Sequence, residues 1–267
     1  DLTDQGSIQE AIDKSQPDEI YNCGAMSFVP TSWNQPILTG DITGLGVTRV
    51  LEAIRHTKRD IRFIQFSSSE MFGQVLETPQ TENTPFYPRS PYGVAKCYGY
   101  YITKNYRESY NMFACNGIFF NHESPRRGTE FVSRKISLAV AKIKLGMQKE
   151  LLLGDMDAKR DWGFAKDYAE AAWLILQQDQ PDDFVIGTGE THTVREFCQI
   201  AFDHVGLNYE DYVRTDPSLI RPAEVKILLA SAAKAHEKLN WYPTTTFYEL
   251  VKMMVDEDLK KLSTPSV

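Results

Sequence analysis

The sequence is organised around residues 90–96, which read Ser-Pro-Tyr-Gly-Val-Ala-Lys. A helix that begins near Tyr92 places Lys96 one turn further on and on the same face, because side chains four positions apart are neighbours on a helix. A nearby ammonium group favours the phenolate, so we expect Lys96 to lower the pKa of Tyr92 from its usual value of about 10. Tyr92 could then accept a proton from an alcohol that is being oxidised.

A second stretch lies just upstream, where residues 67–73 read Ser-Ser-Ser-Glu-Met-Phe-Gly. The apolar run 61–66 before it is typical of a buried strand, which places Ser68 and Glu70 at the carboxyl end of that strand. Open parallel sheets bind their ligands at this edge. Serine runs are usually turn or cap residues, but the two stretches together favour a catalytic cleft.

The pattern along the chain predicts an α/β fold of the Rossmann type, a doubly wound parallel sheet with a smaller, mostly helical substrate-binding domain. The expected strands and helices alternate, with strands over 19–25, 61–66, 112–120 and 184–187 and helices over 41–56, 90–110, 131–145 and 167–178. We expect residues 1–122 to form the dinucleotide-binding domain, with 164–190 returning to it. Residues 123–163 and 191–267 are expected to form mainly the substrate-binding domain.

The composition is that of an ordinary globular protein. The 267 residues are 42% hydrophobic and 24% charged, enough for a full core, and the net charge of −7 argues against a nucleic-acid-binding surface. No apolar run approaches the roughly 20 residues that cross a bilayer, and no signal peptide is visible. The four cysteines are scattered and the five histidines have no metal-binding spacing. We therefore expect a cytoplasmic protein with reduced cysteines, no metal site and no membrane partner.

The chain opens at Asp1 without a methionine, and without the Gly-rich turn that binds the pyrophosphate in a dinucleotide fold. We expect that an intact relative begins some tens of residues earlier. The residues present consequently do not distinguish NADP from NAD.

Several stretches resemble the GDP-mannose 4,6-dehydratases, a family within the extended short-chain dehydrogenase/reductases. The larger group shares the Ser68, Tyr92 and Lys96 set, and hexose 4,6-dehydratases place an acid at the position of Glu70, where epimerases tend not to. The similar stretches run along nearly the whole chain and are 67–73, 84–96, 120–128, 159–165, 180–183, 187–192 and 220–225. Ser68 is a departure, because many members have threonine there, but the hydroxyl is kept.

The resemblance implies conversion of GDP-mannose to GDP-4-keto-6-deoxymannose, a precursor of fucose and related deoxysugars, with NADP as cofactor and a homodimer or homotetramer as the assembly. Tyr92, assisted by Lys96 and Ser68, would take the proton of the hydroxyl on carbon 4 while hydride passes to the cofactor. Glu70 would remove the proton on carbon 5 and protonate the hydroxyl that leaves carbon 6, and the hydride would return to carbon 6. No net oxidation or reduction occurs.

The same resemblance implies the ligand contacts. The implied cofactor contacts are Asp1, Leu2, Ala25, Ser27, Tyr92, Lys96, His122 and Arg127. The implied substrate contacts are Asn121, Arg127, Lys135, Arg160, Arg221 and Glu224. Arginines suit a diphosphate, since a guanidinium bonds two oxygens at once. Glu224 would accept from guanine N–H groups, because a carboxylate has no donor of its own.

Two other hypotheses stay open. The first is a neighbouring sugar-nucleotide enzyme, either a 4-epimerase or a dehydratase for another nucleotide; Glu70 and the Arg-Pro-Ala-Glu of residues 221–224 argue against it. The second is a non-catalytic protein of the dinucleotide fold that acts as a sensor or scaffold. The joint presence of Ser68, Glu70, Tyr92 and Lys96 argues against that hypothesis.

Overall fold

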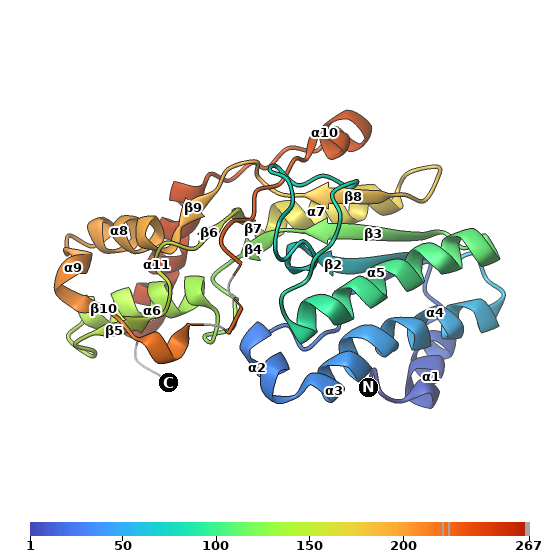
Figure 1. The fold of residues 1–267 in the computed structure, drawn as a ribbon, viewed down its shortest axis with the longest axis horizontal. Helices are drawn as coiled ribbons and strands as arrows, with labels where there is room; N and C mark the ends of the chain where they lie inside the picture. The colour runs from blue at the N-terminus through green and yellow to red at the C-terminus, as the bar shows by residue number, and fades with distance from the viewer. Residues whose placement is uncertain (221, 224, 265–267) are drawn as a thin grey trace.

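The structure is a computed structural model that describes residues 1–220, 222–223 and 225–264 (Figure 1). Within these residues the main sheet has four parallel strands, in the order β1 (Glu19–Asn22), β2 (Arg62–Ser68), β3 (Ala114–Phe119) and β8 (Asp183–Ile186). Every residue of β3 is buried, as expected for a parallel strand covered on both faces. The predicted α/β fold with a parallel sheet is confirmed.

Helices cover both faces of this sheet, because successive side chains of a strand point to opposite sides. Phe63 packs in one apolar cluster with residues of α1 (Gln5–Ser15) and α4 (Gly46–Thr57). Its neighbour Ile64 packs in another cluster with residues of α7 (Ala165–Leu176). This is the doubly wound arrangement that the sequence predicted.

The helix predicted over residues 41–56 is present, but its first residues, 41–45, are π-helical and not α-helical. Two short helices, α2 (Val29–Asn34) and α3 (Pro36–Thr39), lead into a π-helical turn, η1 (Gly40–Leu45), and α4 follows it. A Cβ at Gly44 would lie 3.4 Å from the side chain of Tyr98 and 3.5 Å from the main-chain oxygen of Ala95. The π-helical turn therefore lies directly against α5 (Pro91–Tyr110).

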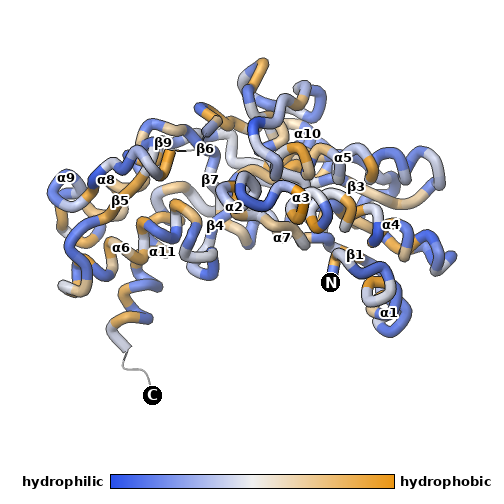
Figure 2. Tube along the Cα trace, turned by 60° about the horizontal axis from the view of Figure 1, so that its bottom comes forward, coloured by the Kyte–Doolittle hydropathy of each residue, from blue (hydrophilic) through white to orange (hydrophobic). Residues whose placement is uncertain are grey.

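A second, mostly helical part lies beside the sheet (Figure 1). Its core is one apolar cluster formed by α6 (Val132–Lys144), α8 (Val194–His204) and α11 (Phe247–Ser263) around Trp162. Figure 2 shows hydrophobic and hydrophilic residues alternating along α11, as expected for a helix with one buried face. This part is the smaller helical unit that the sequence predicted.

Short paired strands and single turns complete the chain. The pairs are β4 (Asn121–Glu123) with β7 (Trp162–Phe164), β5 (Leu151–Leu153) with β10 (Val213–Thr215), and β6 (Lys159–Arg160) with β9 (His192–Thr193). The remaining short helices are η2 (Ser69–Met71), α9 (Tyr209–Tyr212), η3 (Pro217–Leu219) and α10 (Ala233–Leu239). Within the described ranges no helix is both long and apolar enough to span a membrane.

Candidate active site

A cavity of about 860 Å³ lies at the carboxyl end of the sheet, between the sheet and the helical part. Eleven of the predicted site residues line it: Ser68, Glu70, Tyr92, Lys96, Ala25, Ser27, His122, Arg127, Asn121, Lys135 and Arg160. Its volume falls within the range of about 300–1,000 Å³ that is usual for ligand pockets. The structure therefore brings together side chains from the segment after β1, from β2 and η2, and from α5, β4, α6 and β6, which are far apart in the sequence.

Two predicted site residues, Asp1 and Leu2, do not line this cavity, and two others cannot be compared with it. The Asp1 carboxylate accepts hydrogen bonds from the main-chain N–H and the hydroxyl of Thr3, at 2.8 and 2.9 Å. The main-chain oxygen of Leu2 accepts one from Arg49 at 2.9 Å, and neither Asp1 nor Leu2 lines the cavity. Arg221 and Glu224 lie outside the described residues. The roles of all four stay predictions.

The start of α5 is dictated by residues 90–93. The Ser90 hydroxyl caps the helix by accepting from the Gly93 N–H at 3.0 Å, and Pro91 occupies the first helical position, where its missing N–H costs nothing. Tyr92 consequently lies in the first turn. A Cβ at Gly93 would be 2.8 Å from the main-chain oxygen of Glu70, so glycine allows α5 to approach the turn that carries Glu70.

Tyr92 is 7% exposed, and its surroundings contradict one prediction. Burial raises the pKa of Tyr92 to about 12; a hydrogen bond with Ser68 and the charge of Arg127 lower it, whereas the charge of Glu70 raises it. The prediction that Lys96 lowers this pKa is wrong for the protein without ligands. Burial dominates, and the cation that favours the phenolate is Arg127.

Lys96 instead binds the sheet. Its Nζ donates a hydrogen bond to the main-chain oxygen of Phe66 at 2.5 Å and lies 5.7 Å from the centroid of the Tyr92 ring. Burial lowers the pKa of Lys96 to about 8. The ammonium group therefore ties α5 to the end of β2 and is held near Tyr92.

His122 is a neutral residue of the cavity wall. Its Nδ1 bonds the main-chain oxygen of Phe120 at 2.8 Å, which requires the proton to be on Nδ1, and its ring stacks on Tyr168. Burial, with the charges of Arg127 and Lys96, lowers the pKa of His122 to about 4, although the hydrogen bond to Phe120 acts in the opposite direction. The side chain therefore adds no charge to the cavity at neutral pH.

The substrate side of the cavity offers cations and an unused acceptor. Arg127, Lys135 and Arg160 line it, and Arg160 donates to the main-chain oxygen of Val225 at 2.7 Å. Burial lowers the pKa of Lys135, and Asp216 raises it. Among the described residues, the buried Oδ1 of Asn121 has no hydrogen-bond partner. These groups fit a ligand that carries phosphates and hydrogen-bond donors.

Sequence reasoning missed three residues of this site. Glu123 is 2% exposed and accepts a hydrogen bond from Ser133 at 2.6 Å, and Phe28 meets Phe131 edge-on with ring centroids 5.6 Å apart. Glu123 lies in residues 120–128, one of the stretches that resemble the family. An acidic residue directly after a predicted buried strand could therefore have been predicted to lie at the cavity. Phe28 and Phe131 gave no such signal, because each is an ordinary apolar residue in its local sequence.

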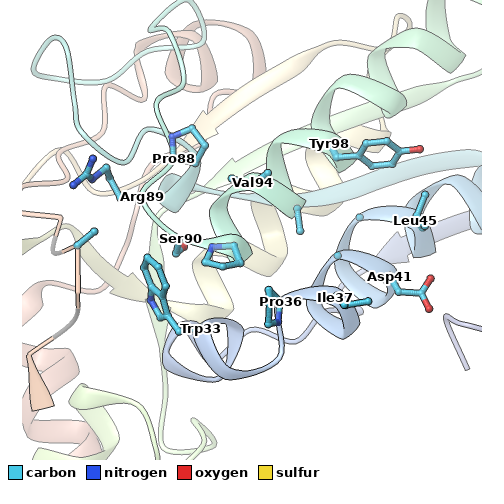
Figure 3. A pocket seen from close by; sticks show the side chains of 15 residues that line it. Trp33, Pro36, Ile37, Asp41, Leu45, Pro88, Arg89, Ser90, Val94 and Tyr98 are labelled. Carbon is cyan, nitrogen blue, oxygen red and sulfur yellow. The ribbon is translucent and has the colours of Figure 1, made fainter. Parts of the chain in front are cut away.

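A second cavity, of about 900 Å³, lies on the other side of the start of α5 (Figure 3). Apolar side chains dominate it, with Trp33, Pro36 and Ile37 on one side and Val94 on the other. None of the predicted site residues in the described part of the chain lines it. We therefore place the candidate active site in the first cavity, which the predicted catalytic residues line. No cluster of three metal-binding side chains occurs in the residues that the structure describes.

Comparison with known proteins decides the family. The family model for GDP-mannose 4,6 dehydratase matches residues 1–254. The chain belongs to the GDP-mannose 4,6-dehydratase family. GDP-mannose 4,6 dehydratase 2 of Arabidopsis thaliana is 53% identical over 264 residues, which are 97% of this chain and 70% of that relative. The human GDP-mannose 4,6 dehydratase is 48% identical over 283 residues, covering 99% of this chain and 76% of that protein.

Solved structures agree with this fold. RMD from Pseudomonas aeruginosa complexed with NADPH has a TM-score of 0.89 at 23% identity, covering 98% of this chain and 87% of that one. UDP-glucose 4-epimerase of Thermus thermophilus in complex with NAD has a TM-score of 0.85 at 25% identity, covering 97% and 83%. The resemblance to GDP-mannose 4,6-dehydratases seen in the sequence is confirmed, as is the Rossmann-like fold.

Proposed function

We propose that this chain dehydrates GDP-mannose to GDP-4-keto-6-deoxymannose, with NADP as its bound cofactor. One observation carries the proposal: Ser68, Glu70, Tyr92 and Lys96 line a single cavity in a chain about half identical to named GDP-mannose 4,6-dehydratases. One fold neighbour is complexed with NADPH and another with NAD, so the choice of NADP rests on the family.

We propose a division of labour between the two parts of the chain. Residues 1–122 and 164–190 would bind the dinucleotide, because they supply the four strands of the parallel sheet. Residues 123–163 and 191–267 would bind mainly the sugar nucleotide. The position of the cavity between sheet and helical part supports this division, since the two ligands must meet where hydride is exchanged.

The cofactor would lie along the ends of β1 and β3. Ala25 and Ser27 follow β1, His122 and Arg127 follow β3, and all four line the cavity. When bound, the nicotinamide would accept a hydride from carbon 4 of the sugar and return it at carbon 6, and carbon 5 would then take up a proton, which balances the one removed from the hydroxyl on carbon 4. Arg127 suits the phosphates of such a ligand, because its guanidinium donates to two oxygens.

Tyr92 would remove the proton from the hydroxyl on carbon 4. Its hydrogen bond with Ser68 places a second hydroxyl beside the reacting oxygen, and Ser68 can hold the alcohol in line. Burial raises the pKa of Tyr92 to about 12 although the charge of Arg127 acts in the opposite direction, so Arg127 would favour the phenolate as the proton is transferred. Lys96, bound to Phe66, fixes the helix that carries the tyrosine.

Glu70 would perform the elimination. Oxidation at carbon 4 acidifies the hydrogen on carbon 5, and the Glu70 carboxylate takes that proton. The same carboxyl group then delivers a proton to the hydroxyl on carbon 6, and water leaves as the carbon 5 to carbon 6 double bond forms. Glu70 lies one short turn after β2, where α5 approaches closely at Gly93.

The decisive experiment follows the mass of the sugar. The protein, expressed with any residues that precede Asp1 in its gene, is incubated with GDP-mannose and NADP⁺ beside a Glu70→Gln variant. We expect the wild type to remove one water and the variant, which keeps the size of the side chain but cannot carry the proton, to remove none. An unchanged mass with altered stereochemistry would point to an epimerase, and no reaction with any sugar nucleotide would point to a non-catalytic protein.

We also propose that the chain self-associates and that it works in the cytoplasm. Large exposed apolar side chains gather on α2, α3, η1 and α5, among them Trp33, Ile37, Leu45 and Val94, and an exposed patch of this kind is typical of an interface (Figure 3). Light scattering on wild type and Ile37→Asp tests the assembly. We expect a dimer or tetramer that the variant shifts to monomer, whereas a monomeric wild type would contradict self-association.

The four cysteines, all within the described residues, are free, which is typical of a reducing compartment such as the cytoplasm.

A further inference from the structure

We infer that Glu123 is a positioning residue that holds Arg127 so that its guanidinium group faces the cavity and binds a ligand phosphate. The inference rests on the proposed function, because it needs phosphate-bearing ligands in this cavity. Neither the substrate contacts nor the cofactor contacts predicted from the sequence include Glu123.

The surroundings of Glu123 require a cationic partner. Glu123 is the last residue of β4, is 2% exposed, and its Oε2 lies 3.1 Å from Nε of Arg127. Burial raises the pKa of Glu123, while Arg127 and a hydrogen bond from Ser133 lower it. A buried carboxylate without a partner is strongly unfavourable, so the ionised acid and Arg127 hold one another in place.

Arg127 is fixed from a second side. Its guanidinium carbon lies 3.6 Å from the centroid of the Phe131 ring, and the Phe131 ring in turn meets Phe28 edge-on. Within the described residues Nε has no hydrogen-bond partner, so the attraction to Glu123 is that of an ion pair. A guanidinium held at Nε keeps its two terminal amino groups for other acceptors. Arg127 lines the cavity, where phosphate oxygens would be those acceptors.

A merely structural role for the pair makes a different prediction. Arg134 and Asp258 form another buried ion pair, which joins α6 to α11 and does not line the cavity. If Glu123 only joined β4 to the start of α6, its loss would resemble the loss of Asp258, with lower stability and unchanged ligand affinity. If Glu123 orients Arg127, the loss of Glu123 lowers the affinity for a ligand only when Arg127 is present.

The test is a double-mutant cycle on ligand binding. Dissociation constants for NADP⁺ and, separately, for GDP-mannose are measured by calorimetry for wild type, Glu123→Gln, Arg127→Ala and the double variant. Glu123→Gln keeps the size of the side chain and removes its charge. We expect this variant to raise the dissociation constant of one of the two ligands about tenfold, the effect expected for loss of a charged hydrogen bond. In the protein that already carries Arg127→Ala, we expect Glu123→Gln to have little further effect. The ligand whose dissociation constant rises is the one whose phosphate Arg127 binds.

Asp258→Asn is the matched control, and Glu123→Asp is the second variant if Glu123→Gln does not fold. Equal weakening by Glu123→Gln with and without Arg127, or a fall in melting temperature with unchanged dissociation constants, would overturn the inference. A wild type that does not bind GDP-mannose would overturn the proposed function instead, and the NADP⁺ measurements would still decide the role of Glu123.

Discussion

Lys96 and Phe66 are joined by a hydrogen bond of 2.5 Å from the ammonium Nζ to the main-chain oxygen. The bond connects the helix that carries Tyr92 to the end of the strand that carries Ser68. Lys96 is 3% exposed, and its burial disfavours the charged form. Because the pKa of Lys96 is lowered, any activity that needs the charged ammonium has an upper pH limit.

We predict that kcat/KM falls as the pH rises past about 8. Burial lowers the pKa of Lys96 to about 8, so the ammonium loses its proton well before an exposed lysine would. The neutral amine can still donate to Phe66, but the positive charge beside Tyr92 is lost. Tyr92, with its pKa raised to about 12, keeps its proton over this range. The pH profile of kcat/KM reports groups of the free enzyme and is the measurement to make.

Cys23→Ser is the control for this profile, because Cys23 lines the same cavity and burial raises the pKa of its thiol. The alkaline fall should persist in Cys23→Ser and move to higher pH in Lys96→Arg, since arginine does not lose its proton in proteins. A fall that Cys23→Ser abolishes would assign the limit to the thiol.

Tyr92→Phe should lower kcat by about 10² to 10⁴, the range for loss of a general acid–base group. The substitution removes only the phenolic oxygen from a buried ring, so the fold should be retained. Single-turnover kinetics should show the loss in the oxidation step, while the melting temperature stays near that of the wild type. Activity within a few fold of the wild type would remove Tyr92 from the mechanism.

His122 should make the protein without ligands sensitive to acid. Burial lowers the pKa of His122 from 6.5 to about 4, so between these values the unfolded chain binds a proton that the folded chain does not. Stability is therefore complete above about pH 6.5 and is lost as the pH falls towards 4. The expected loss between about pH 7.5 and about pH 5 is about 2 kcal/mol.

Urea unfolding at these two pH values, for wild type and His122→Gln, measures this loss. The amide of glutamine can donate to Phe120 but does not titrate, so the variant should lose about 2 kcal/mol less than the wild type on acidification. Equal losses in both proteins would show that other groups cause the acid sensitivity.

Gly93→Ala should damage both stability and catalysis. A Cβ there would be 2.8 Å from the main-chain oxygen of Glu70 and 3.0 Å from Cβ of Pro88, so the start of α5 must shift. Overpacking of this kind costs about 1–3 kcal/mol, and a displacement of Tyr92 from Glu70 should lower kcat about tenfold or more. Chemical denaturation and steady-state kinetics measure the two effects.

Gly40→Ala is the matched control, because a Cβ at Gly40 meets nothing within 4 Å and the residue has helical backbone angles. It should be neutral or slightly stabilising, since alanine favours helix more than glycine does. If Gly93→Ala behaves like Gly40→Ala, the close approach of α5 to Glu70 is not required.

The sequence by itself determined the features that depend on neighbouring residues. Apolar runs and helical spacing located the strands and helices, because burial on one or both faces leaves a period in the chain. The helix predicted over residues 90–110 agrees with α5, and the spacing of Tyr92 and Lys96 placed both on it. Ser68 and Glu70 were predicted at the cavity because the ends of parallel strands share one edge of a sheet.

Only the tertiary structure decided the features that depend on what surrounds a residue. The direction of the Tyr92 pKa shift was mispredicted, because burial by the whole fold outweighs a cation one helical turn away. The pair of Glu123 with Arg127 and the contact of Phe28 with Phe131 were missed, because the fold, not the sequence, brings these side chains together. Electrostatic and packing energies depend on distance and burial in three dimensions, and a sequence pattern records neither.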